Sequence, residues 1–153
     1  MKHLISDTRE KKNQHVLRYF DKVGVKYEIC KLDYGDYMDV YRPHICIDRK
    51  QNIAELAKNC TADKDRFKRE IERAQAAGCQ LVILVEQNRY KDRDRWIHVD
   101  TIMDLMLWTS PHTKIRGEKV YRVLASWCAR YPLRVEFCDK KNTGRKIMEI
   151  IYR

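Results

Sequence analysis

Apolar runs of strand length alternate with amphipathic segments along the first half of the chain. Residues 3–6 (HLIS) predict a buried strand, and residues 79–86 (CQLVILVE) form a continuous apolar run typical of a central strand covered on both faces. Residues 26–32 alternate between two faces. Residues 39–41 and 44–48 predict two strands that are joined tightly. These runs predict the strands of one sheet.

Helical spacing of apolar positions separates these runs. Residues 16–23 predict a helix that begins near Asn13 and ends at Gly24. Residues 52–59 predict a short helix, and residues 63–78 predict a longer one that ends at Gly78. The inward face of the longer helix would carry Phe67, Ile71, Ala74 and Ala77.

The last third of the chain predicts a helix over 117–131, a strand over 133–139 and a final helix over 142–153. Residues 87–116 give no assignment beyond a short helix within 100–108. The order of elements indicates an α/β fold with a mixed central sheet flanked by helices. We expect residues 1–153 to form a single domain, because the chain has the length of one and contains no linker.

Charge and cysteine content narrow the function classes. The chain of 153 residues has a formal net charge of +10, which favours polyanionic partners. Its six cysteines show no metal-type spacing, so buried free thiols are expected, as at Cys30 and Cys46 within apolar runs. Free thiols, no signal peptide and no membrane-spanning run predict a soluble protein of the reducing cytoplasm.

Acids gather around one lysine in this otherwise basic chain. Asp48 and Lys50 are two residues apart on a predicted strand and therefore project to the same side. Asp36 follows Gly35, which accepts turn conformations that other residues resist, and strand pairing would bring Asp36 towards Asp48. Acids that also follow the first strand, Asp7 and Glu10, would lie off a sheet edge, where α/β proteins place ligand sites.

Clustered carboxylates repel each other, and a divalent cation removes that conflict. Mg²⁺, or Mn²⁺ in its place, binds oxygen ligands and retains several waters, so two or three carboxylates are enough. Such an ion polarises a phosphate oxygen and acidifies a bound water. Lys50 would orient that water or stabilise the charge that builds on the phosphate.

An acid, a long gap and then D/E-x-K is the pattern of the PD-(D/E)XK nuclease superfamily. The series DTRE (7–10), GDY (35–37), DRK (48–50), RFKRE (66–70) and LVILVE (81–86) resembles the XPF-type structure-specific endonuclease domain over about residues 3–87. The resemblance implies a restriction-endonuclease-like fold for this core, followed by an extension over 88–153. It resembles the small stand-alone members of bacterial and phage genomes.

The resemblance carries over residue by residue. Asp7 and Glu10 match the first acidic motif, Asp36 the Gly-Asp motif, and DRK the Glu-Arg-Lys signature. Asp48 stands where the family usually has glutamate, which shortens one ligand by a methylene. The implied catalytic residues are Asp7, Glu10, Asp36, Asp48, Arg49 and Lys50. The implied metal ligands are Asp7, Asp36 and Asp48, with Arg49 fixing the site or a phosphate.

The resemblance implies a Mg²⁺- or Mn²⁺-dependent DNA endonuclease that acts on branched, flapped or nicked DNA in repair or recombination, without a small-molecule cofactor. The alternatives are an inactive DNA-binding module and a scaffolding subunit. The chain has no helicase region and no clear helix-hairpin-helix pair. The C-terminal apolar stripe predicts core packing, with a homodimer interface as the alternative because family members generally pair.

Basic residues would hold the nucleic-acid backbone. We expect Arg9, Arg66, Lys91 and Arg93 to be among them. The segment NRYKDRDRW (88–96) either tracks phosphates and stacks bases on Tyr90 and Trp96, or forms a solvated loop with internal ion pairs. Glu86 is either a further site acid or a simple strand-end carboxylate.

Overall fold

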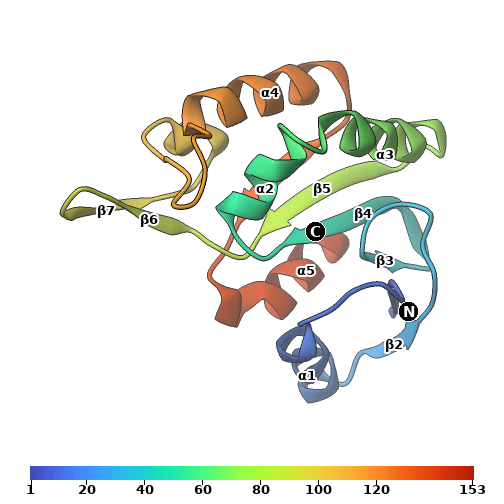
Figure 1. Cartoon of the computed structure of the whole chain (residues 1–153). Helices are drawn as coiled ribbons and strands as arrows, with labels where there is room; N and C mark the ends of the chain where they lie inside the picture. The colour runs from blue at the N-terminus through green and yellow to red at the C-terminus, as the bar shows by residue number, and fades with distance from the viewer.

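The computed structural model describes residues 1–153. A six-stranded sheet runs through its middle in the order β2-β1-β3-β4-β5-β8 (Figure 1). Strand β3 is antiparallel to both neighbours, and the other neighbouring pairs are parallel. The predicted mixed α/β sheet is therefore confirmed. Its strands are β1 (His3–Ser6), β2 (Lys26–Ile29), β3 (Tyr37–Asp39), β4 (Arg42–Lys50), β5 (Gln80–Val85) and β8 (Arg134–Phe137).

Helices cover both faces of this sheet. Helices α1 (Gln14–Val23) and α5 (Thr143–Tyr152) lie on one face, and α2 (Ile53–Asn59), α3 (Lys64–Ala76) and α4 (Gly117–Arg130) lie on the other (Figure 1). Strand β5 serves both layers: Ile83 joins the core under α2, α3 and α4, whereas Leu84 joins the core under α1 and α5. This is the doubly covered strand that its unbroken apolar run predicts. None of the helices is both long and apolar enough to cross a membrane.

Several boundaries differ from the predictions. Strand β3 begins at Tyr37. Strand β4 begins at Arg42 and runs through Pro43, and the part of β4 that pairs with β5 begins at Ile45. Pro43 has no N–H to donate, and it is tolerated because it lies before the part of β4 that pairs with β5. Asn13 occupies the N-cap of α1 but makes no side-chain capping hydrogen bond, and its side-chain amide donates to the Tyr37 hydroxyl at 3.0 Å.

The six cysteines are free, but the expected burial is wrong at Cys30. Strand β2 ends at Ile29, one residue earlier, and leaves the Cys30 side chain exposed at the edge of the sheet. Alternation does not report burial here, because the residues of β2 are exposed on both faces except for the half-buried Tyr27.

Residues 87–116, which the sequence left mostly unassigned, contain a β-hairpin. It consists of β6 (Arg89–Asp92) and β7 (Arg95–His98), forms a separate two-stranded sheet and projects from the body of the protein (Figure 1). The predicted short helix in 100–108 is the 3₁₀ turn η1 (Ile102–Leu105). A second 3₁₀ turn, η2 (Lys140–Asn142), precedes α5.

The topology collects functional residues at one edge of the sheet. Strands β1, β4 and β5 run in the same direction, so Asp7, the DRK segment and Glu86 lie at their carboxyl ends. Because β3 runs the other way, its first residue lies at this same edge, and Asp36 directly precedes it. Four separate segments therefore meet where ligand sites of α/β sheets form.

Candidate active site

A polar cleft of about 490 Å³ opens at this edge. Its lining includes all six predicted catalytic residues and the predicted DNA contacts Arg9 and Arg66. Lys91 and Arg93 lie elsewhere, on the β6–β7 hairpin. The structure thus brings together residues that are separated by more than forty positions in the chain.

Asp48 and Lys50 form the centre of the cleft. Both side chains are buried, and the Lys50 ammonium lies 3.1 Å from Asp48 Oδ1 and 4.8 Å from the centre of the Phe67 ring. Burial alone would lower the pKa of Lys50, but the charges of Asp48 and Asp36 outweigh it and raise the pKa. The pair of acids thus favours the protonated form of Lys50.

The turn before β3 places Asp36 beside this pair. Gly35 has φ +71°, and a Cβ atom there would lie 2.2 Å from Cys46 Sγ, so only glycine fits. Asp36 Oδ2 accepts the Arg49 N–H at 2.8 Å. Burial, then the charges of Asp48 and Glu10, raise the pKa of Asp36 well above its usual value. The carboxylates repel each other as the sequence predicts.

The Arg49 side chain leaves β4 on the face opposite to Asp48 and Lys50 and forms a buried cluster at the border of the cleft. It donates to Glu10 Oε2 at 2.7 Å, to the Lys11 carbonyl at 2.6 Å and to Glu86. Glu86 also contacts His15 of α1 and accepts from Thr143 of α5 at 2.7 Å. The Arg49 donors are thus occupied by protein groups, which supports the role of fixing the site over that of holding a phosphate.

The same contacts define the positions of Glu10 and Glu86. Both Glu10 oxygens accept from Arg49, at 2.7 and 3.1 Å, so Glu10 is the partner of a bidentate pair. Glu86 belongs to the buried cluster and is not among the residues that line the cleft. Neither pairing has a signal in the sequence, because the partners are far apart along the chain.

Asp7 is buried next to the cleft with its oxygens engaged. Oδ1 accepts the Leu32 N–H at 2.7 Å, and Oδ2 accepts from Arg9 Nε at 2.9 Å. Burial would raise the pKa of Asp7, but Arg9 and the Leu32 amide overcome it and lower the pKa. The Arg9 side chain is exposed, so its contact with Asp7 is the one that a ligand can displace.

Three of the other residues that line the cleft are acids or buried polar groups of the helices α2 and α3. Glu70 of α3 accepts the Gly35 N–H at 2.8 Å, and its pKa is raised by burial and by the Asp48 charge. Glu55 of α2 accepts the Gln51 N–H at 2.9 Å. Asn59 ends the same helix and is buried. The helical spacing of Glu55 and Asn59 places both on the face towards β4, which is the only signal that the sequence carries for them.

Two acceptor atoms in the cleft have no partner. Asp48 Oδ2 and Asn59 Oδ1 are the buried side-chain polar atoms of the protein that make no hydrogen bond. Such orphaned atoms are costly unless a ligand, ion or water satisfies them. No three of the acids form a ready-made metal-binding group. A hydrated divalent ion still fits, because Mg²⁺ retains waters and needs few carboxylates.

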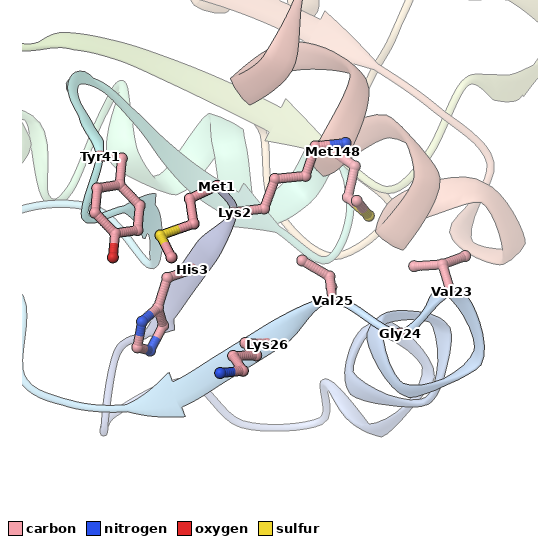
Figure 2. A pocket seen from close by; sticks show the side chains of 9 residues that line it. All are labelled: Met1, Lys2, His3, Val23, Gly24, Val25, Lys26, Tyr41 and Met148. Atoms are coloured by element: carbon pink, nitrogen blue, oxygen red, sulfur yellow. The ribbon is translucent and has the colours of Figure 1, made fainter.

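A second cavity, of about 450 Å³, lies away from this edge (Figure 2). Figure 2 shows Val23 and Gly24 at the end of α1, Met148 of α5, and the first residues of the chain around it. No acid lines this cavity, and its basic groups are Lys2, His3 and Lys26. It therefore lacks the ligands for a cation, and the polar cleft remains the candidate active site.

An open mixed sheet with acids and one lysine at the carboxyl ends of its strands defines a restriction-endonuclease-like nuclease domain. The model of the ERCC4 domain matches residues 6–149, and the chain belongs to this family. The match extends well beyond residues 3–87, where the recognisable motifs lie. No protein among those with curated descriptions matches the sequence.

Solved structures show the same fold. XPF from Aeropyrum pernix superposes with a TM-score of 0.68 at 19% identity, over 97% of this chain and 63% of that chain. The same protein in a complex with DNA gives a TM-score of 0.67 at 18% identity, over 99% of this chain and 64% of that chain. The chain thus spans less than two thirds of these relatives. The expected XPF-type nuclease fold is confirmed.

Proposed function

We propose that this protein is a divalent-metal-dependent endonuclease that hydrolyses phosphodiester bonds of DNA, with branched, flapped or nicked DNA as its substrate in repair or recombination. The observation that carries the proposal is the unpartnered Asp48 Oδ2 next to the Lys50 ammonium, within an acid-lined cleft of a basic protein. The A. pernix relative in complex with DNA supports the substrate class.

Asp36 and Asp48 would hold the ion, and Asp7 would join them when its contact with Arg9 opens. Mg²⁺ or Mn²⁺ would supply Lewis-acid charge at a phosphate oxygen and acidify a bound water. Lys50 would stay protonated and stabilise negative charge on the phosphate while the water oxygen bonds to phosphorus and the P–O bond to the leaving oxygen breaks. The attacking water would lose a proton to solvent, and the leaving oxygen would gain one from solvent. Arg49 and Glu10 hold β4 in position from the opposite face of the sheet.

A cleavage panel tests the proposal. Labelled single strand, duplex, flap, fork and four-way junction are incubated with the protein in Mg²⁺ and in Mn²⁺, at two salt concentrations. We expect cleavage by the wild type and its loss in Asp36→Ala and Lys50→Met. The matched control Arg18→Gln/Lys22→Gln removes two exposed charges of α1 and is expected to cleave normally. Binding without cleavage in both metals would contradict the proposal and favour an inactive DNA-binding module.

Pairing of two copies is a separate part of the proposal. It rests on the family resemblance and on exposed apolar side chains of Met103, Met106 and Leu107, next to the hairpin. Light scattering across a range of concentrations measures the mass in solution. A monomer that cleaves DNA at every concentration would contradict the homodimer, and it would also contradict a purely scaffolding role.

A further inference from the structure

The β6–β7 hairpin separates its side chains onto two faces. In its antiparallel register Tyr90 is opposite Ile97, and Lys91 is opposite Trp96. Tyr90 is buried and donates its hydroxyl to the Asp104 carbonyl, and Ile97 packs against the same core. The inner face therefore anchors the hairpin to the protein and removes Tyr90 from any contact with a ligand. The outer face carries Arg89, Lys91, Trp96 and His98.

Trp96 organises the two cations of this outer face. Its side chain is 55% exposed, with the Arg89 guanidinium carbon 4.5 Å and the Lys91 ammonium 5.4 Å from its ring centre. Cations at these distances are attracted by the ring and lose part of their freedom. The exposed tryptophan and its two basic neighbours together present an aromatic surface with positive charge.

The acids near this segment do not pair with Arg89 or Lys91, and Asp94 lies exposed at the turn between the two strands. Asp92 pairs with Arg95 at 3.3 Å on the inner side of the hairpin, whereas Asp100 pairs with His98 of the outer face at 3.0 Å. Neither Arg89 nor Lys91 takes part in an ion pair with a carboxylate. Both cations are thus free to meet an anionic partner.

The base of the hairpin is tied to the catalytic segment. Gln87 accepts the Ile53 N–H at 2.9 Å, at the start of the helix that follows Lys50, and donates to the Arg89 carbonyl at 2.9 Å. Val85, which pairs with Lys50 across the sheet, precedes Arg89 by only four residues. The outer face thus has a defined position relative to the cleft.

We propose that the Arg89–Trp96–Lys91 face of the hairpin binds the sugar-phosphate backbone of duplex DNA, with Trp96 holding the two cations ready for adjacent phosphates. Alternate residues of a strand lie roughly 6.8 Å apart. The two cations are therefore spaced to contact adjacent phosphates along one DNA strand rather than a single phosphate. The inference rests on the proposed nuclease function for its ligand, but it concerns binding and requires no cleavage.

Binding is measured in EDTA, so that the result is independent of metal and of cleavage. Fluorescence anisotropy follows a labelled duplex and a single strand of equal length across a salt series. We expect Arg89→Gln/Lys91→Gln to weaken duplex binding roughly tenfold near physiological salt and to lower the salt slope by about 1.8, since each phosphate contact contributes about 0.9. The matched double variant Arg18→Gln/Lys22→Gln, with the same charge change on α1, is expected to alter both values much less.

Trp96→Leu tests the organising role, because it removes the aromatic face and keeps both charges. We expect about two- to fivefold weaker duplex binding with an unchanged urea midpoint, since the side chain lies on the outer face. Trp108 and Trp127 are buried, so iodide quenching reports mainly on Trp96. Duplex DNA is expected to protect Trp96 from iodide in the wild type and not in the Arg89/Lys91 double variant.

Three results would overturn the inference. One is duplex affinity that falls equally in the hairpin and α1 double variants. Another is a loss that is confined to single strands in Trp96→Leu, which would indicate base stacking instead. The third is a changed mass in solution for Trp96→Leu, which would make this face a contact between copies of the chain. A wild type that binds duplex through this face but never cleaves would refute the nuclease proposal alone.

Discussion

Gly35 gives the most direct test of how the fold positions the site. Alanine at this position meets two obstacles: a backbone with φ +71°, and a Cys46 sulfur 2.2 Å from the new Cβ. The left-handed conformation costs an alanine about 1–2 kcal/mol. Forcing a methyl group into packed surroundings costs about 1–3 kcal/mol more. We therefore expect Gly35→Ala to lower the free energy of unfolding by about 2–5 kcal/mol.

Gly78 provides the matched control. It has almost the same φ, +72°, but no atom lies within 4 Å of a Cβ built on it. Gly78→Ala should therefore show the backbone cost alone, about 1–2 kcal/mol. Urea unfolding followed by tryptophan fluorescence measures both variants. With a slope of about 2 kcal/mol per M, Gly35→Ala should unfold about 0.5–1.5 M earlier than Gly78→Ala.

A double variant separates the clash from the backbone strain. Cys46→Ala removes the sulfur, so Gly35→Ala should cost less in that background than in the wild type, and the two changes should not be additive. Equal midpoints for Gly35→Ala and Gly78→Ala, or strict additivity with Cys46→Ala, would refute the argument that the sulfur defines the space under the turn.

Three further variants test the charges of the site and its supports. Burial and two neighbouring carboxylates raise the pKa of Asp36, so the folded state binds the proton of this carboxyl group more tightly than the unfolded state does. The wild type should therefore lose stability relative to Asp36→Asn as the pH rises above about 4. A difference between the two urea midpoints that stays constant from pH 4 to 8 would contradict this. Arg49→Met leaves two buried glutamates without their cation and should cost about 3–5 kcal/mol, with an unchanged urea midpoint as the contrary result. Tyr152→Phe removes a hydrogen-bond donor to the buried Asp39 and should lower the free energy of unfolding by about 1–3 kcal/mol. Thermal unfolding measures this, and an unchanged melting temperature would show that Asp39 has sufficient other donors.

The elements that the sequence predicted well are those with a strong local pattern. The apolar run of β5 and the stripe of α3 need only neighbours in the chain to be recognised, and both appear within two residues of their predicted ends. The hairpin has no such pattern, because each of its strands carries only one or two apolar residues among charges. Tyr90 and Ile97 show their inward direction only after the two strands are paired.

The candidate site divides in the same way. Alternation along β4 predicts that Asp48 and Lys50 share a side, and the structure places them 3.1 Å apart. The contacts of Arg49 with Glu10 and Glu86 span 39 and 37 positions of the chain, and no local sequence pattern predicts them. Which acid faces the cleft and which is held in a buried pair depends on tertiary packing.

The three consecutive residues of the DRK segment therefore have two different roles, because successive side chains of a strand point to opposite faces. Asp48 and Lys50 face the cleft under α2 and α3, where one oxygen of Asp48 lacks a partner and Lys50 is held as a cation. Arg49 faces α1 and α5 and joins the ends of β1 and β5 through their glutamates. A shift of one residue in the register of β4 would exchange these faces and bury the cleft charges in the wrong layer. The buried arginine thus selects the register in which the acid and the lysine reach the cleft.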